Sequence, residues 1–157
     1  EPIPTVHEAL RRMALASVRI YPEVKRTERP EELRSVARMT RKLDLVERTV
    51  FISMEWDALA TIREEEPEAR IGYIVERPRR TEEAFELARD DALAMVDFDA
   101  RILLALPRHA ERARALGIPL AAWTVNTVSM AERLLELGVP RITTNEVETL
   151  VEWKAGL

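Results

Sequence analysis

Glu23 and Lys25 are the first candidates for chemistry, because they lie two positions apart in an apolar, β-branched segment, residues 18–25. Side chains two apart on a β-strand point to the same face of the sheet. A carboxylate there suits a divalent cation such as magnesium or calcium, and an ammonium group suits a phosphate. The same spacing also suits a plain ion pair on a solvated strand, and spacing alone favours that interpretation.

A second group of polar side chains follows two apolar segments near the end of the chain. Residues 122–126 read Ala-Trp-Thr-Val-Asn, and residues 138–145 read Gly-Val-Pro-Arg-Ile-Thr-Thr-Asn. Each apolar strand therefore ends in hydroxyl and amide groups, with a helical stretch between the two. In α/β folds the carboxyl ends of the strands carry the site, so this edge is where we expect function.

The other ionisable candidates have simpler interpretations. His7 falls in a helix-start pattern, and His109 follows Pro-Arg at the start of another helix, so we expect ordinary surface or helix-start histidines. Asp97 and Asp99 are spaced to share one face of a strand, but a loop or cap role is favoured. Two further carboxylates near predicted strand ends are Glu55 and Glu76.

Strands and helices alternate along the whole chain. This alternation predicts a parallel sheet with right-handed crossovers. Six strands are expected, whereas a closed (βα)8 barrel needs eight. An open doubly wound sheet, a partial barrel and a barrel completed by another chain all fit the pattern. The predicted strands are residues 18–25, 49–54, 70–75, 93–98, 120–125 and 141–144.

Helix ends are marked by residue types with a capping function. Thr5 and Glu8 form a capping-box pattern, and Pro30 and Pro107 suit the first turn of a helix. Helix starts are also expected at Thr81, Ser129 and Asn145, and helix ends at Gly117, Gly138 and Gly156. These signals place one helix after each strand.

Composition limits the class of protein. The 157 residues are 46% hydrophobic and 33% charged, which suits a single folded domain over residues 1–157. The net charge is −4 and no basic block is present, so nucleic acid is not an expected partner. No segment is apolar enough to span a membrane. Without cysteine no disulfide is available, and we expect a cytoplasmic location, although a leader removed before Glu1 would also fit.

Taken together, the motifs resemble those of the glycerophosphodiester phosphodiesterase family. Residues 3–6, Ile-Pro-Thr-Val, are followed at the family spacing by Glu23-Val24-Lys25. Ser53-Met54 corresponds to the family's Ser-Phe, and residues 71–74 to its Leu-Gly-Tyr-Leu. The Trp-Thr-Val-Asn motif of residues 123–126 is intact. The resemblance covers essentially the whole chain and implies a partial TIM-type (βα)8 barrel of about six βα units, without its first two strands.

The resemblance also implies roles for particular residues. Glu23 would be a ligand of magnesium or calcium, and Lys25 would neutralise the substrate phosphate as a catalytic group. Trp123 would form a wall beside the glycerol moiety, although a barrel-filling aromatic is the alternative. Met54 replaces the family's Phe in the other wall. Asn126 is expected to be a helix cap rather than a substrate contact.

The implied activity is metal-dependent hydrolysis of a glycerophosphodiester to glycerol 3-phosphate and an alcohol such as choline or ethanolamine. The family's amino-terminal His-Arg-Gly, Glu-x-Asp and His-Asp elements are absent from these residues. We therefore expect this chain alone to be inactive. A non-catalytic relative that binds a phosphorylated ligand or acts as a scaffold is the alternative. In either case we expect self-association or a second polypeptide that completes the barrel.

Overall fold

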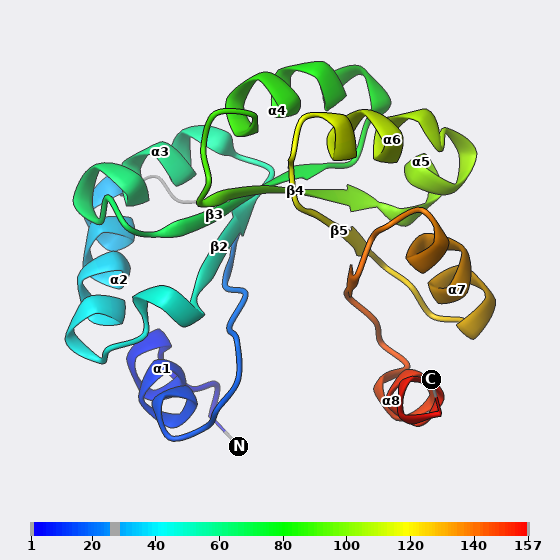
Figure 1. The fold of residues 1–157 in the computed structure, drawn as a ribbon. Coiled ribbons are helices and arrows are strands. Elements are labelled where there is room, and N and C mark those ends of the chain that lie inside the picture. The colour runs from blue at the N-terminus through cyan, green and yellow to red at the C-terminus, as the bar shows by residue number, and fades with distance from the viewer. Residues whose placement is uncertain (1, 26–28, 157) are drawn as a thin grey trace. The chain divides into compact units, whose positions relative to one another are not determined.

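The computed structural model describes residues 2–25 and 29–156 as strands alternating with helices (Figure 1). The strands follow one another in the sheet in sequence order, from β1 to β6. The strands are β1 (Glu23–Val24), β2 (Val50–Ser53), β3 (Arg70–Val75), β4 (Ala94–Asp99), β5 (Leu120–Trp123) and β6 (Arg141–Ile142). The helices are α1 (Val6–Ala14), α2 (Pro30–Lys42), α3 (Trp56–Glu65), α4 (Thr81–Ala88), α5 (Ala100–Ala105), α6 (Arg108–Ala115), α7 (Val128–Glu136) and α8 (Val147–Ala155), with short 3-10 turns η1 (Val46–Arg48) and η2 (Pro78–Arg80).

The chain divides into two compact units, Glu1–Gly72 and Tyr73–Leu157, and the boundary falls within β3. In the first unit, β1 and β2 are parallel, with Glu23 opposite Ile52 and Val24 opposite Ser53. The core of this unit is apolar and fully buried, because α2 and α3 each turn one face toward the strands. Its members include Ala37, Leu45, Phe51, Leu59 and Ile62.

The first strand is much shorter than the eight-residue segment 18–25 predicted from sequence. Only Glu23–Val24 is a strand, and upstream of it Ile20 forms an isolated bridge with Thr49. Pro22 lies between these two pieces and has no backbone N–H to donate to a neighbouring strand, so it interrupts the ladder. Its carbonyl still accepts a hydrogen bond from Ile52 N at 3.1 Å. As a result, β1 is only two residues long and consists of Glu23 and Val24.

Ion pairs connect α2 to the far end of α3. The Arg41 guanidinium binds both carboxylate oxygens of Glu66, and it also binds Glu68 at 2.8 Å. Arg38 makes a comparable ion pair with Glu65 at 3.1 Å. Glu66 is only 2% exposed, and the hydrogen bonds from Arg41 hold the pKa of its carboxyl below the usual value. Much of the charge in this part of the sequence is therefore structural.

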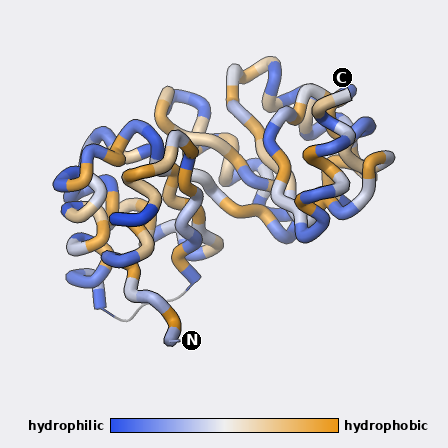
Figure 2. The backbone as a smooth tube through the Cα atoms, turned by 90° about the horizontal axis from the view of Figure 1, so that it is seen from below, coloured by the Kyte–Doolittle hydropathy of each residue, from blue (hydrophilic) through white to orange (hydrophobic). Residues whose placement is uncertain are grey.

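In the second unit, β4 and β5 are parallel, and β5 and β6 are parallel. Phe85 of α4 and Phe98 of β4 are fully buried and meet edge to face, with ring centroids 6.0 Å apart. Leu103 and Leu134 are buried in the same unit. Hydrophobic and hydrophilic segments alternate along the helices (Figure 2), as expected for helices with one face on a core.

The helix boundaries confirm some sequence signals and correct others. The Thr5–Glu8 capping box is present, and Pro30 opens α2. Gly117 and Gly138 adopt left-handed φ values of 69° and 81° after α6 and α7. The cap of α7 is Thr127 rather than Ser129.

The prediction that Asn145 caps the last helix is wrong. The N-cap of α8 is Glu146, without a side-chain hydrogen bond. The extra helix α5 was also not predicted, because it follows β4 directly without a separate turn signal. Among the helices in the described part of the chain, none is long and apolar enough to cross a membrane.

Candidate functional site

The predicted pair Glu23 and Lys25 is present at the carboxyl end of β1. Lys25 Nζ lies 3.9 Å from Glu23 Oε2, and the two side chains are 79% and 34% exposed, respectively. An ion pair this long and this exposed adds little to stability. The carboxylate and the ammonium group are therefore both accessible to a ligand, and no tight mutual hydrogen bond occupies them.

Ser53 connects this pair to the next strand. Its side-chain hydroxyl donates a hydrogen bond to Val24 O at 2.5 Å and accepts one from Glu55 N at 2.9 Å. Ser53 is fully buried and Val24 is half-buried, so the bond joins the carboxyl ends of β1 and β2 with partial shielding from water. Met54 follows Ser53 and is half-buried. In the sequence, only the family motif indicated Ser53. Its position at the end of a strand, shortly before a helix, is a further sequence signal that could have identified it.

Trp123 ends β5 in the second unit, opposite Asp99 of β4 in the strand register. It is half-buried, its peptide bond to Thr124 is cis, and its indole Nε1 is buried without a hydrogen-bond acceptor among the described residues. An indole in this environment offers an apolar surface and one unused N–H donor. This fits a wall beside a small polar ligand as well as the alternative of a packing aromatic.

Asn126 is not the helix cap that the sequence predicted. Its Oδ1 accepts hydrogen bonds from Asn145 N at 3.0 Å and from Thr144 Oγ1 at 3.4 Å. The prediction that Asn126 caps a helix was wrong because Thr127, one residue later, supplies the capping hydroxyl of α7. Asn126 thus joins the segments that follow β5 and β6, the two segments singled out by their polar ends.

Asp97 and Asp99 are both buried, 3% and 6% exposed, respectively. Asp99 Oδ1 accepts a hydrogen bond from Arg101 N at 2.9 Å and caps α5, which confirms the cap role. The Arg101 guanidinium also binds this carboxylate and lowers the pKa of Asp99. Because the Asp99 carboxylate caps α5 and also binds Arg101, it is not available as a general base.

The two histidines occupy different environments. His7 lies exposed on α1, as predicted. His109 lies in the first turn of α6, which confirms the helix-start alternative, but it is not a surface residue, because α6 turns it inward and only 9% of it is exposed. Its ring stacks on Phe98 at a centroid distance of 6.3 Å, and burial lowers its pKa. Tertiary packing therefore makes His109 a core residue of the second unit.

The described residues do not build a metal site on their own. No group of three or more histidine or carboxylate side chains in residues 2–25 and 29–156 is arranged to hold a metal ion. Glu23 brings one carboxylate, and its neighbour Lys25 is a cation. Magnesium and calcium prefer several oxygen ligands, so Glu23 alone does not fit a resident divalent cation.

These observations define an α/β protein with an accessible carboxylate–ammonium pair at one strand end and an indole at another. The Glycerophosphoryl diester phosphodiesterase family profile matches residues 1–149. The chain belongs to this family. No curated relative matches it.

Solved structures of phosphodiesterases have a fold similar to that of this chain. A glycerophosphodiester phosphodiesterase from Parabacteroides distasonis is 26% identical with a TM-score of 0.73, and the match covers 97% of this chain and 65% of that one. An Oleispira antarctica phosphodiesterase, solved with the product sn-glycerol-3-phosphate, is 21% identical with a TM-score of 0.71, covering 92% and 58%. The Thermotoga maritima enzyme is 19% identical with a TM-score of 0.68, covering 86% and 57%.

The predicted fold class is confirmed by these likenesses. The sequential strand order and the alternating helices form an α/β fold of the partial TIM-barrel type. The chain spans less than two thirds of the length of each of these structures, between 57% and 65%.

Proposed function

We propose that this chain carries phosphate-binding and glycerol-binding residues of a glycerophosphodiester phosphodiesterase site. The observation that carries the proposal is the pair Glu23 and Lys25 at the carboxyl end of β1, accessible and only 3.9 Å apart. Family membership over residues 1–149 gives this pair the context of phosphodiester chemistry. The Oleispira phosphodiesterase with bound sn-glycerol-3-phosphate supports a small phosphorylated ligand.

Each residue has a separate role in this proposal. The Lys25 ammonium group offsets the charge on the phosphoryl oxygens, which is stabilising both in the bound state and as charge develops during hydrolysis. Met54, in the first unit, offers an apolar side chain for the glycerol carbons next to Ser53. Trp123, in the second unit, is the apolar wall that the family resemblance implies. Magnesium or calcium at Glu23 is the cofactor that the family resemblance implies. Because the described residues do not complete such a site, we assign the metal no step.

We also infer that these 157 residues alone do not turn over substrate. Phosphodiester hydrolysis needs a proton acceptor for the attacking group and a donor for the leaving alcohol. His109 is buried against Phe98, and His7 lies exposed on α1, so neither histidine has the accessible, oriented environment of a catalytic acid or base. A chain with these residues binds a phosphorylated ligand without cleaving it, which was the alternative left open by the sequence.

The direct test is an assay of choline release from sn-glycero-3-phosphocholine with magnesium or calcium. We expect no release above the rate in buffer. Release that disappears in Glu23→Ala would overturn the inference that the chain is inactive.

The proposal that Lys25 binds the phosphate group of a ligand is tested by titrating the chain with sn-glycerol 3-phosphate. We expect Lys25→Gln to weaken binding about tenfold, as the loss of one charge-assisted contact does. Lys154→Gln, which removes an exposed lysine of α8, is the matched control and leaves the affinity unchanged. Equal affinity of wild type and Lys25→Gln would contradict the proposed site.

A further inference from the structure

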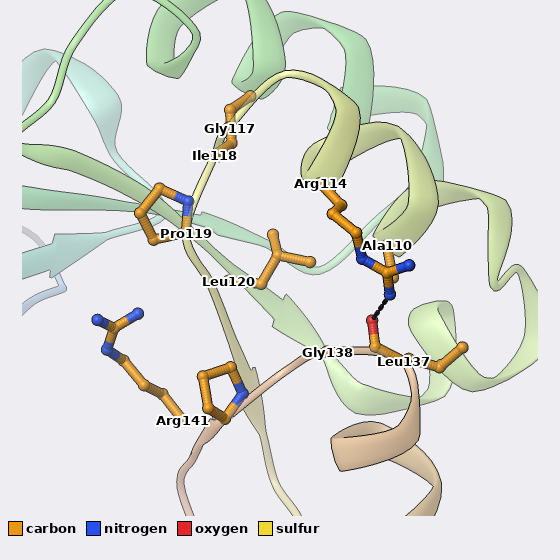
Figure 3. Close-up of a pocket in the computed structure, with 10 residues that line it drawn as sticks. Ala110, Arg114, Gly117, Ile118, Pro119, Leu120, Leu137, Gly138 and Arg141 are labelled. Atoms are coloured by element: carbon orange, nitrogen blue, oxygen red, sulfur yellow. Dashed lines mark hydrogen bonds between the residues drawn. The ribbon is translucent and has the colours of Figure 1, made fainter.

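A cavity of about 270 Å³ lies within the second unit, at the amino-terminal ends of β5 and β6 (Figure 3). It is therefore at the other end of β5 from Trp123. Its apolar lining comes mainly from Ile118, Pro119, Leu120 and Pro140. The volume is just below the range of about 300–1,000 Å³ that is typical of small-molecule pockets, so a compact ligand would fill it.

Two arginines are the charged residues that line this cavity, and no aspartate or glutamate lines it with them. Arg114 from α6 and Arg141 from β6 stand on either side of Pro119 and Leu120 in Figure 3. The protein as a whole is acidic, with a net charge of −4. The cavity is thus a local concentration of positive charge in an acidic protein, which favours an anionic ligand.

The guanidinium group of Arg114 is held in place before any ligand binds. Its Nη2 donates a hydrogen bond to Leu137 O at 2.8 Å (Figure 3). A Cβ atom at Gly138 would come within 3.1 Å of the same nitrogen, so the glycine leaves the room that the guanidinium occupies. Arg114 carries further N–H donors that this one bond does not use. An oriented guanidinium loses less entropy when it binds an oxyanion.

Arg141 has no such internal partner. Its side chain makes no hydrogen bond or ion pair with the described residues, although the residue is half-buried. By contrast, the buried Glu66 carboxylate is paired with Arg41. A guanidinium without an internal partner keeps all its N–H donors for an anion, and hydrogen bonds between charged groups are the strong ones.

We propose that this cavity binds a small organic anion. Arg141 holds its oxyanion group, a phosphate or a carboxylate, and Arg114 adds positive charge from the other side of Leu120. The apolar part of the ligand contacts Pro119, Leu120 and Pro140. The site is separate from the one proposed at Glu23 and Lys25. Its ligand binds without bond cleavage, because the lining contains no nucleophile or general base.

The test is a calorimetric titration with phenyl phosphate in the presence of a chelator. Lys25→Gln is the background, so that binding at the proposed phosphodiesterase site does not contribute. We expect Arg141→Gln to weaken phenyl phosphate binding about tenfold, and Arg114→Gln to weaken it less, because Arg114 contributes charge rather than a direct contact. Arg133→Gln, which removes an exposed arginine of α7, is the matched control and has no effect.

The outcomes separate the two sites. Loss of binding in Arg141→Gln but not in Arg133→Gln supports the cavity. Binding that depends on Lys25 and not on Arg141 overturns the cavity proposal and leaves the proposed function standing. The absence of phenyl phosphate binding in the Lys25→Gln background also overturns it. Thermal unfolding of each variant, followed by circular dichroism, verifies that the substituted proteins are folded.

Inorganic phosphate tests the apolar part of the proposal. We expect it to bind the Lys25→Gln protein more weakly than phenyl phosphate does, because it gains nothing from Pro119, Leu120 and Pro140. Equal affinities would show that the cavity recognises the anion alone and would overturn the assignment of an organic ligand.

Discussion

Ser53 Oγ donates a hydrogen bond to Val24 O at 2.5 Å, and this partly buried bond joins the ends of β1 and β2 next to Glu23 and Lys25. β1 is only two residues long, so its ladder with β2 is short. A side-chain hydrogen bond that continues the ladder therefore matters more here than at the end of a long strand. It fixes the backbone from which the Lys25 side chain projects.

We expect Ser53→Ala to lower the free energy of unfolding by about 1 kcal/mol, because the half-buried Val24 loses the hydrogen-bond donor of its carbonyl. The affinity for sn-glycerol 3-phosphate should fall as well, since the end of β1 is no longer held. Urea unfolding and ligand titration measure the two effects. Ser129→Ala removes an exposed hydroxyl on α7 and should change neither quantity. An unchanged affinity in Ser53→Ala would show that the bond does not position the site.

The Arg41–Glu66 pair predicts a pH-dependent contribution to stability. Arg41 lowers the pKa of the Glu66 carboxyl in the folded state. The unfolded chain therefore takes up a proton first as the pH falls through about 4.5, and the stabilisation is lost as the pH continues down through the lower folded pKa. Arg41→Gln should reduce the urea midpoint at pH 7 and show a smaller deficit at pH 3.

Arg38→Gln is the control for this pair, because Arg38 lies on the same helix and binds the more exposed Glu65, at 24% exposure. We expect it to change the urea midpoint less than Arg41→Gln does, since solvent screens an exposed pair. Equal pH profiles for the two variants would contradict a special role for the buried Glu66 carboxylate.

His109 predicts a second pH dependence, at a higher pH. Burial lowers its pKa in the folded state from about 6.5. As the pH falls below that value, the unfolded chain binds the proton before the folded chain does, so the free energy of unfolding decreases, by at most about 1.4 kcal/mol per pH unit. His109→Phe retains an aromatic ring against Phe98 and should remove this slope between pH 7 and pH 5.

His7→Gln is the comparison for this prediction, because His7 is exposed on α1. Its profile of unfolding free energy against pH should follow the wild type. A wild-type slope that persists in His109→Phe would place the responsible proton on another group.

Self-association stays a prediction, and the surface of α8 offers a way to test it. Val147 and Val151 are 58% and 60% exposed and lie four residues apart, so they share one face of the helix. We expect sedimentation velocity to show species heavier than the 18.0 kDa chain at high concentration, and Val151→Lys to shift them toward the monomer. A monomer at all concentrations would contradict the prediction.

Local signals in the sequence determined the alternation of strands and helices, the Thr5–Glu8 capping box and the shared face of Glu23 and Lys25. These depend on residues a few positions apart, whose side-chain directions follow from strand and helix geometry. The motifs around Glu23 and Trp123 also identified the family, since motif recognition needs only residue types in order.

Only the tertiary structure decided which polar groups meet across the chain. The Ser53 bond to Val24 spans 29 positions, and the Arg41 pair with Glu66 spans 25. The burial of His109 depends on the face that α6 turns toward Phe98. The cavity between Arg114 and Arg141 forms because α6, β5 and β6 come together. Such contacts depend on how separate elements pack, and that packing is set by the whole core rather than by any local run of residues.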